Sequence, residues 1–118
     1  MRLINATPHS IMLILPDGQT RTIPREAAAA RIETRSGEQV SDADGVPILA
    51  PPRFVAIRNL PERAEGTLVI VSQLLAVAVA ALLPDRTDVV YPGTAASDRP
   101  LRTQGGIRGV RRLIRAVV

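Results

Sequence analysis

Short apolar runs separated by turn residues occupy the first part of the chain. Arg2–Asn5, Ile11–Leu15 and Thr20–Ile23 are rich in aliphatic or β-branched side chains, which favour strands. Pro16-Asp17-Gly18-Gln19 separates the second run from the third, and its proline and glycine suit the φ angles of a tight turn. The pattern predicts one strand followed by a β-hairpin.

The next segment, Arg25–Arg35, has two interpretations. Its four alanines favour a helix. Yet apolar and charged residues alternate from Ala30 to its end, as in a half-buried strand. Because Pro24 precedes the segment and Ser36-Gly37 follows it, a stable helix has little room, and we expect a strand.

Polar and apolar segments also alternate in the middle of the chain. Ser41–Gly45 is entirely small or acidic and predicts a polar loop with a tight turn at Asp44-Gly45. Val46–Leu49 and Arg53–Asn59 predict strands, and Pro51-Pro52 between them indicates a sheet edge or a break.

The longest uncharged stretch, Thr67–Leu83, is barely long enough to cross a bilayer. Its first part is β-branched, its second part is rich in alanine and leucine, and Ser72 and Gln73 separate the two. These features favour a buried strand, Thr67–Val71, leading into a buried helix, Ser72–Leu83, over a membrane-spanning helix. We therefore expect no membrane partner.

After a short strand at Asp88–Tyr91 and a loop at Thr94–Pro100, the C-terminus has two interpretations. Apolar residues from Ile107 to Val118 fall on one side of a helical wheel and arginines on the other, as in a basic amphipathic helix. Against this, Gly105-Gly106 predicts a hairpin turn. Periodicity alone slightly favours the helix.

Composition narrows the chemistry. The 118 residues support one domain, and the 15 basic residues are all arginines, set against 11 acids and one histidine. The chain lacks cysteine and lysine, which excludes a thiol nucleophile, a cysteine zinc site and a lysine Schiff base. Asp42 and Asp44 lie two residues apart, but the other ligands of a calcium loop are missing. We expect no metal site and no cofactor.

The positive charge gathers at the C-terminus. Residues 99–118, which we call the basic element, hold six arginines and no acid, whereas residues 1–98 carry a balance of −2. Arginines bind phosphates through paired hydrogen bonds, so the candidate anion-binding residues are Arg108, Arg111 and Arg112, with Arg58 from the middle of the chain. The alternative is a solvated face whose arginines pair with acids such as Glu62 or Glu65.

His9 is the one side chain that titrates near neutral pH without help. It lies in Thr7-Pro8-His9-Ser10, a rigid turn that can present an imidazole and two hydroxyls together. We include His9 among the candidate ligand-binding residues. A turn histidine hydrogen-bonded to backbone is the alternative, and a small hydrolase using His9 would need a carboxylate and an oxyanion hole from elsewhere.

Several short motifs together resemble a family of small proteins found in phages, prophages and actinobacterial genomes. They cover most of the chain: Leu3-Ile4-Asn5-Ala6-Thr7-Pro8-His9, Asn59-Leu60-Pro61, Thr67-Leu68-Val69-Ile70-Val71-Ser72, Arg86-Thr87-Asp88-Val89-Val90, Pro92-Gly93-Thr94 and Gly106–Arg112. The resemblance implies a cytoplasmic protein of phage or mobile-element origin. It also implies a C-terminal strand rather than a helix, and it supplies no catalytic residues.

The sequence thus predicts an α+β fold with one buried helix around Ser72–Leu83, in a single compact domain (1–118) that carries the basic element. Its sheet is expected to be mainly antiparallel, built of hairpins or closed in a barrel-like arrangement. For function we expect a non-enzymatic, homo-oligomeric binding protein whose arginines hold an anionic, nucleotide-like ligand. The alternative is an interaction protein whose arginine face docks an acidic partner or nucleic acid. Only Phe54 and Tyr91 can stack on bases, so nucleic acid is not favoured.

Overall fold

The computed structural model describes residues 1–26 and 28–118, which form twelve strands and one α-helix. Most strand pairs are antiparallel, so the predicted α+β class is confirmed. The sheets of the described residues do not close on themselves, and the barrel-like arrangement is not formed.

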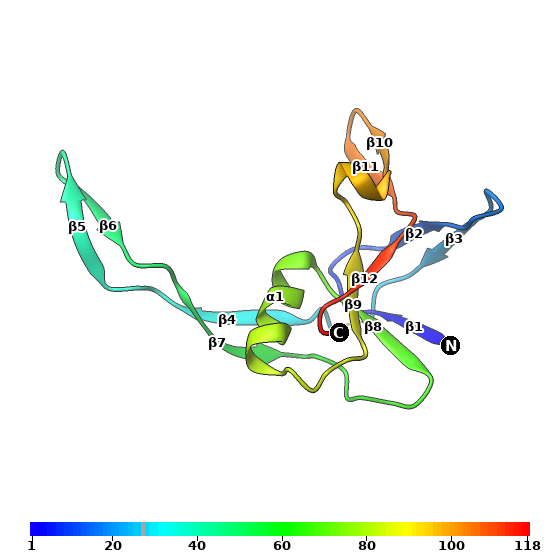
Figure 1. Ribbon diagram of the computed structural model, residues 1–118, viewed down its shortest axis with the longest axis horizontal. Coiled ribbons are helices and arrows are strands. Elements are labelled where there is room, and N and C mark those ends of the chain that lie inside the picture. Colours follow the sequence, from blue (N-terminus) through cyan, green and yellow to red (C-terminus); the bar gives the residue numbers. More distant parts are fainter. Residues whose placement is uncertain (27) are drawn as a thin grey trace.

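A four-stranded sheet lies at the centre of the molecule (Figure 1). Its order is β1 (Arg2–Asn5), β8 (Thr67–Ile70), β9 (Val89–Pro92) and β12 (Leu113–Arg115). β8 runs parallel to both β1 and β9, whereas β12 runs antiparallel to β9. Parallel neighbours need a crossover connection, and the helix supplies it between β8 and β9.

That helix, α1 (Gln73–Leu82), follows the predicted bounds closely. Ser72 caps it, since its hydroxyl oxygen accepts a hydrogen bond of 3.3 Å from the backbone N–H of Leu75. Only the inner face is buried, through Leu75, Ala76, Ala78 and Val79, so the prediction of a buried helix holds for one face. No helix in the described part of the chain is long and apolar enough to cross a membrane.

Two hairpins flank the sheet. β2 (Ile11–Ile14) and β3 (Thr20–Ile23) form the predicted N-terminal hairpin. β10 (Leu101–Thr103) and β11 (Gly106–Gly109) form a second one, so the C-terminal helix favoured by periodicity is wrong. There are two physical reasons. Gly106 turns at a φ of 107°, so that β11 pairs with β10, and Val110 then pairs with Leu13 of β2.

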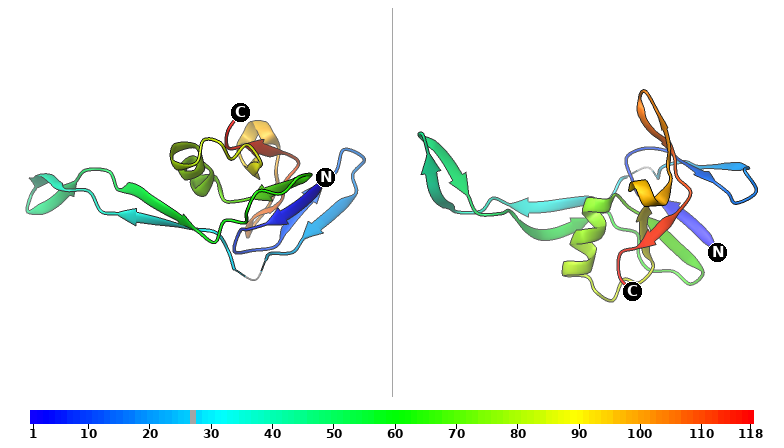
Figure 2. Two further views of the ribbon diagram at one scale, coloured as in Figure 1. Left: turned by 90° about the horizontal axis from the view of Figure 1, so that it is seen from below. Right: turned by 45° about the horizontal axis from the view of Figure 1, so that its top comes forward.

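A long arm extends from the opposite side (Figures 1 and 2). Its base is β4 (Arg31–Arg35) paired with β7 (Arg53–Arg58), and its outer part is β5 (Gln39–Ala43) paired with β6 (Val46–Leu49). The strand preferred for the segment after Pro24 is therefore confirmed at β4, while Ala27 lies outside the described residues.

The arm corrects two predictions. Residues 41–43 are strand and not loop, although the tight turn at Asp44-Gly45 is confirmed by φ angles of 52° and 81°. The Cα radius of gyration is 16.7 Å, against about 13.5 Å for a compact chain of this length. The compact shape predicted for the chain is therefore wrong, because the arm stands away from the body.

A fully buried asparagine joins the central sheet to the N-terminal hairpin. Asn5 ends β1, and its side-chain amide donates to the carbonyl oxygens of His9 (2.8 Å) and Ile23 (3.0 Å). Its carbonyl oxygen accepts from the backbone N–H and the hydroxyl of Thr7, at 3.0 and 2.6 Å. All the hydrogen-bonding groups of the amide are thus used, so the Asn-x-Thr-Pro-His motif acts as a structural clamp.

An arginine–aspartate pair lies just before β9, next to the segment around Pro61. The Nε and Nη2 atoms of Arg86 lie 2.9 and 3.0 Å from the two carboxylate oxygens of Asp88, and Nη2 also donates to the carbonyl oxygen of Pro61. The hydrogen bond and the charge of Arg86 lower the pKa of Asp88 below its ordinary value of 3.8, against the opposing effect of burial.

Replacing Asn5 with alanine tests the clamp. It leaves the carbonyl groups of His9 and Ile23 without their buried donor, so Asn5→Ala is expected to lower the free energy of unfolding by about 2–4 kcal/mol. Urea denaturation measures this, with the exposed Gln73→Ala, expected to change it by less than about 0.5 kcal/mol, as the control. Equal effects of the two substitutions would contradict the clamp.

The Arg86–Asp88 pair predicts a pH dependence. Because the folded-state pKa of Asp88 is lowered, its stabilising contribution is present above the unfolded value of 3.8 and is lost as the pH falls through the folded pKa. Urea denaturation as a function of pH is expected to show a smaller acid loss in Asp88→Asn than in the native chain. At neutral pH this variant is less stable by about 1–3 kcal/mol. Parallel acid limbs for the two proteins would argue against the pair.

Candidate functional site

A cleft lined by arginines lies where the C-terminal part of the chain meets the turn between β2 and β3. We call it the basic cleft, and its volume is about 390 Å³. Arg99, Arg111 and Arg112 line it, together with Asp98. The wall formed by the turn consists of Ile14, Leu15, Pro16 and Gly18.

Backbone pairing between β2 and the residues after β11 builds this cleft. The N–H of Ile14 donates to the carbonyl oxygen of Val110 at 2.8 Å, and the N–H of Val110 donates to that of Met12 at 3.0 Å. Gly109 packs closely on β2, because a Cβ atom there would lie 2.8 Å from the terminal methyl carbon of Met12 and 3.2 Å from Cδ1 of Ile14. The pairing carries Arg111, the next residue along the chain, to the turn between β2 and β3.

Asp98 lies in the wall of the cleft that faces the turn between β2 and β3. It is buried, and its Oδ2 accepts a hydrogen bond of 3.2 Å from the backbone N–H of Ala95. Nη1 of Arg112 lies 3.8 Å from its Oδ1. Gly93 leaves the space for this carboxylate, since a Cβ atom on Gly93 would lie 2.8 Å from the Asp98 Cγ.

A backbone carbonyl orients one guanidinium of the cleft, that of Arg111. Arg99 has a left-handed φ of 53°, and its carbonyl oxygen accepts a hydrogen bond of 2.8 Å from Nε of Arg111. The carbonyl oxygen of Arg112 accepts from the N–H of Gly93 at 2.8 Å. A carbonyl acceptor orients a guanidinium without neutralising it, so the cleft keeps a net positive charge.

Most arginines of the basic element have no carboxylate partner among the described residues. Within the described residues, Arg112 is the one member of that element that lies within salt-bridge distance of a carboxylate. The suggested pairing of these arginines with Glu62 or Glu65 is absent from those same residues. Arg102 and Arg115 instead donate to the carbonyl oxygens of Thr94 and Thr87.

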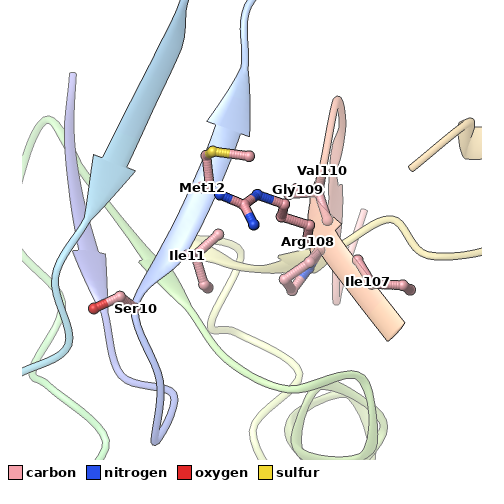
Figure 3. Close-up of a pocket in the computed structure, with 8 residues that line it drawn as sticks. Ser10, Ile11, Met12, Ile107, Arg108, Gly109 and Val110 are labelled. Carbon is pink, nitrogen blue, oxygen red and sulfur yellow. The ribbon is translucent and has the colours of Figure 1, made fainter. Parts of the chain in front are cut away.

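Arg108 lies beside a second, smaller hollow. This hollow of about 160 Å³ is formed between β2 and β11, and Figure 3 shows the Arg108 side chain reaching across from β11 towards Met12. Ile11, Met12 and Ile107 make its surface mainly apolar. Arg108 therefore neighbours the basic cleft without lining it.

The other two predicted site residues are elsewhere. Arg58 ends β7 at the base of the arm, where its Nη2 lies 2.7 Å from a carboxylate oxygen of Glu33 and its side chain is 67% exposed. His9 has an exposed side chain and lines neither hollow, while its carbonyl oxygen takes part in the Asn5 clamp. The structure therefore brings together Arg111 and Arg112, with Arg108 nearby, and separates them from His9 and Arg58.

Sequence reasoning missed part of the cleft. Arg99 belongs to the basic element, but no pattern distinguished it from the other arginines there. Asp98 directly precedes Arg99 but carried no signal of its own, and the apolar wall from Ile14 to Pro16 comes from a segment distant in the chain. The Pro-Asp-Gly turn was visible in the sequence, but nothing in it indicated which segment would pack beside it.

Comparison with known proteins adds no identity. No protein-family model, curated protein or solved structure matches the chain. The described residues also bring together no group of three or more histidine, aspartate and glutamate side chains suited to a metal ion.

The wall around Asp98 yields a prediction. Gly93→Ala places a methyl group against the Asp98 carboxylate, so the free energy of unfolding is expected to fall by about 1–2 kcal/mol. Gly105→Ala is the matched control, because its Cβ atom would meet only the Thr103 hydroxyl at 3.9 Å. Thermal and urea denaturation compare the two variants. If Gly93→Ala is as stable as Gly105→Ala, the close packing on Asp98 is wrong.

Proposed function

We propose that this protein binds a small phosphorylated anion in the basic cleft and sequesters it without catalysing a reaction. The observation that carries the proposal is the gathering of Arg99, Arg111 and Arg112 around one cleft with a single carboxylate. Guanidinium groups form paired, charge-assisted hydrogen bonds with phosphate oxygens. Three of them against one acid leave a surplus of two positive charges for the ligand.

The shape of the cleft supports a ligand with an uncharged part as well. Ile14, Leu15 and Pro16 form an apolar wall beside the arginines. The volume of about 390 Å³ falls within the usual range of small-molecule sites. A nucleoside phosphate has this combination of an anionic end and a flat, weakly polar end. A nucleotide-like ligand is therefore the proposed class.

The residues around the cleft support binding over catalysis. Asp98 is the one carboxylate that lines it, and that group is already engaged by the N–H of Ala95 and by Arg112. His9, the residue on which a hydrolase would depend, lines neither of the two hollows. A nucleophile with an adjacent base is the usual arrangement for hydrolysis, and the cleft offers none among its described lining residues.

The setting we propose is the cytoplasm of a bacterial host, with the protein encoded by a phage or mobile element. Its support is the resemblance carried by the Asn-x-Thr-Pro-His segment and the later motifs. In such a setting, sequestering a nucleotide-like ligand would withhold it from a host pathway.

A second candidate function has its own observation. Arg102, Arg108 and Arg115 are exposed and lie outside the basic cleft, so the positive surface extends beyond a small ligand. An extended positive surface suits nucleic acid or an acidic protein partner. We keep this function as the alternative.

Titration calorimetry with ADP and with pyrophosphate tests the anion site. Arg111→Gln and Arg112→Gln are each expected to weaken binding about tenfold to hundredfold, because each removes a charge-assisted contact. Arg2 is the exposed first residue of β1, away from the cleft. The Arg2→Gln variant loses the same charge and is expected to bind the ligands like the native chain. Absence of binding by the native protein, or equal losses in all three variants, would refute the proposed site.

Salt dependence separates the two candidate functions. A cleft that holds one small anion weakens modestly with added salt, whereas a duplex that contacts many arginines weakens steeply. Under the alternative, replacing Arg102, Arg108 and Arg115 one after another would weaken binding of a labelled DNA duplex step by step. Tight, salt-sensitive duplex binding without ADP or pyrophosphate binding would favour the alternative.

A further inference from the structure

The outer part of the arm exposes an apolar surface that its own chain does not cover. We call residues 36–52 the arm tip. Every residue of β5 and β6 is exposed, including Val46 at 62% and Ile48 at 43%. An isolated two-stranded ribbon is marginally stable in water, and large aliphatic side chains are costly there. The arm tip therefore has the character of a surface that is covered by a partner.

The arm tip has apolar side chains on both faces, but only one of the two faces is free of charge. Residues opposite each other in an antiparallel pair point to the same side, and so do residues two apart on one strand. Ser41 is opposite Ile48 and Ala43 is opposite Val46, so these four residues share a face. Asp42, its partner Pro47 and Leu49 lie on the other side. The face that carries Val46 and Ile48 is therefore the uncharged one, which suits an uncharged helix surface.

The same chain presents a second uncovered apolar surface, the outer face of α1. Leu74 is 63% exposed and Val77 is 54% exposed, one turn apart on the helix. No charged residue occurs between Gln73 and Leu82. A helix that is apolar all round is normally buried on all sides, but here only the inner face is packed. The outer face therefore also calls for a partner.

Charge and position indicate that a second copy of the chain covers both surfaces. The arm tip carries Glu38, Asp42 and Asp44 and no arginine, so the rest of the chain, with fifteen arginines and eight acids, has a net charge of +7. An acidic arm is attracted to a basic body. In the structure the arm extends away from its own body (Figures 1 and 2), so its own chain does not cover it.

The place of α1 makes a reciprocal exchange possible. α1 packs against β4 and β7 at the base of the arm, so each copy presents its uncovered helix face beside the point from which its own arm departs. A twofold axis that passes midway between the arm tip and α1 of one copy lays the arm of each copy over the helix of the other. Both apolar surfaces are then covered by one symmetric contact.

We propose that the protein forms a dimer in which the arm tip of one copy lies across the outer face of α1 of the other. The contact is made by Val46 and Ile48 from the arm and by Leu74 and Val77 from the helix. None of these residues lines the basic cleft, so this inference stands independently of the proposed anion binding.

Native mass spectrometry of the full chain tests the proposal. The native protein is expected to be dimeric, whereas Val77→Glu on the helix and Val46→Glu on the arm are each expected to raise the dimer dissociation constant at least about tenfold. Gln104→Glu adds the same charge to the exposed turn between β10 and β11, away from both surfaces, and Gln39→Glu adds it to β5 opposite Leu49, off the contact face. Both controls are expected to remain dimeric.

Mixing the two disruptive variants identifies which surfaces meet. In a reciprocal dimer, the intact arm of Val77→Glu fits the intact helix of Val46→Glu, so one of the two contacts is restored and a heterodimer appears at its own mass. A dimer made by two helices or by two arms gains no such restored contact. Recovery of the heterodimer therefore supports the arm-on-helix arrangement, and its absence overturns it.

Two further results would also overturn the proposal: a monomeric native protein, or undiminished dimers of Val77→Glu. Because Val77 and Val46 are more than half exposed, both variants are expected to unfold as cooperatively as the native chain in circular dichroism. If one of them fails to fold, the other still tests the contact on its own.

Discussion

The buried amide of Asn5 is the interaction on which the rest of the structure depends. It is fully satisfied by Thr7, His9 and Ile23, and it lies where the end of β1 meets the start of β2 and the end of β3. An asparagine buried without partners would be strongly destabilising, so the amide fixes one relative position of the central sheet and the N-terminal hairpin. That hairpin supplies the apolar wall of the basic cleft, and its strand β2 receives the backbone of Val110. The fold of the first residues therefore determines where the last arginines lie.

The two ends of the molecule follow different physical constraints. At the C-terminal end, backbone pairing on β2 brings several arginines together. Among the described residues, only Arg112 has a carboxylate partner there, which is Asp98. The remaining positive charge is available to an anion. At the opposite end, the arm and the outer face of α1 leave aliphatic surface in water. Charge without a counter-ion and apolar surface without cover are both typical of binding surfaces. We propose a small anion for the first surface and a second copy of the chain for the second.

The sequence predicted what is decided locally and missed what is decided by tertiary contacts. Ser72 marks the start of α1 because a helix cap depends on neighbouring residues alone. The sequence predicts a loop for residues 41–43, which belong to β5, because a strand with solvent on both sides carries no apolar alternation. The C-terminal helix predicted from periodicity is wrong, because the backbone of Val110 forms hydrogen bonds with β2 instead of helical ones. Arg111 and Arg112 were identified together since they are adjacent, whereas Arg58 was grouped with them on residue type alone, which gives no distance. The same reason explains why the apolar wall of the cleft went unseen.

The most direct test of the central claim, that the basic cleft holds a phosphorylated anion, is side-chain NMR of the native protein. Pyrophosphate is titrated into ¹⁵N-labelled protein while the Nε–H signals of the arginines are followed. The account predicts saturable shifts for Arg99, Arg111 and Arg112, with the signals of Arg2 and Arg53, which lie on β1 and β7, unchanged. Small, unsaturable shifts shared equally by all the arginines, or no shifts, would contradict it.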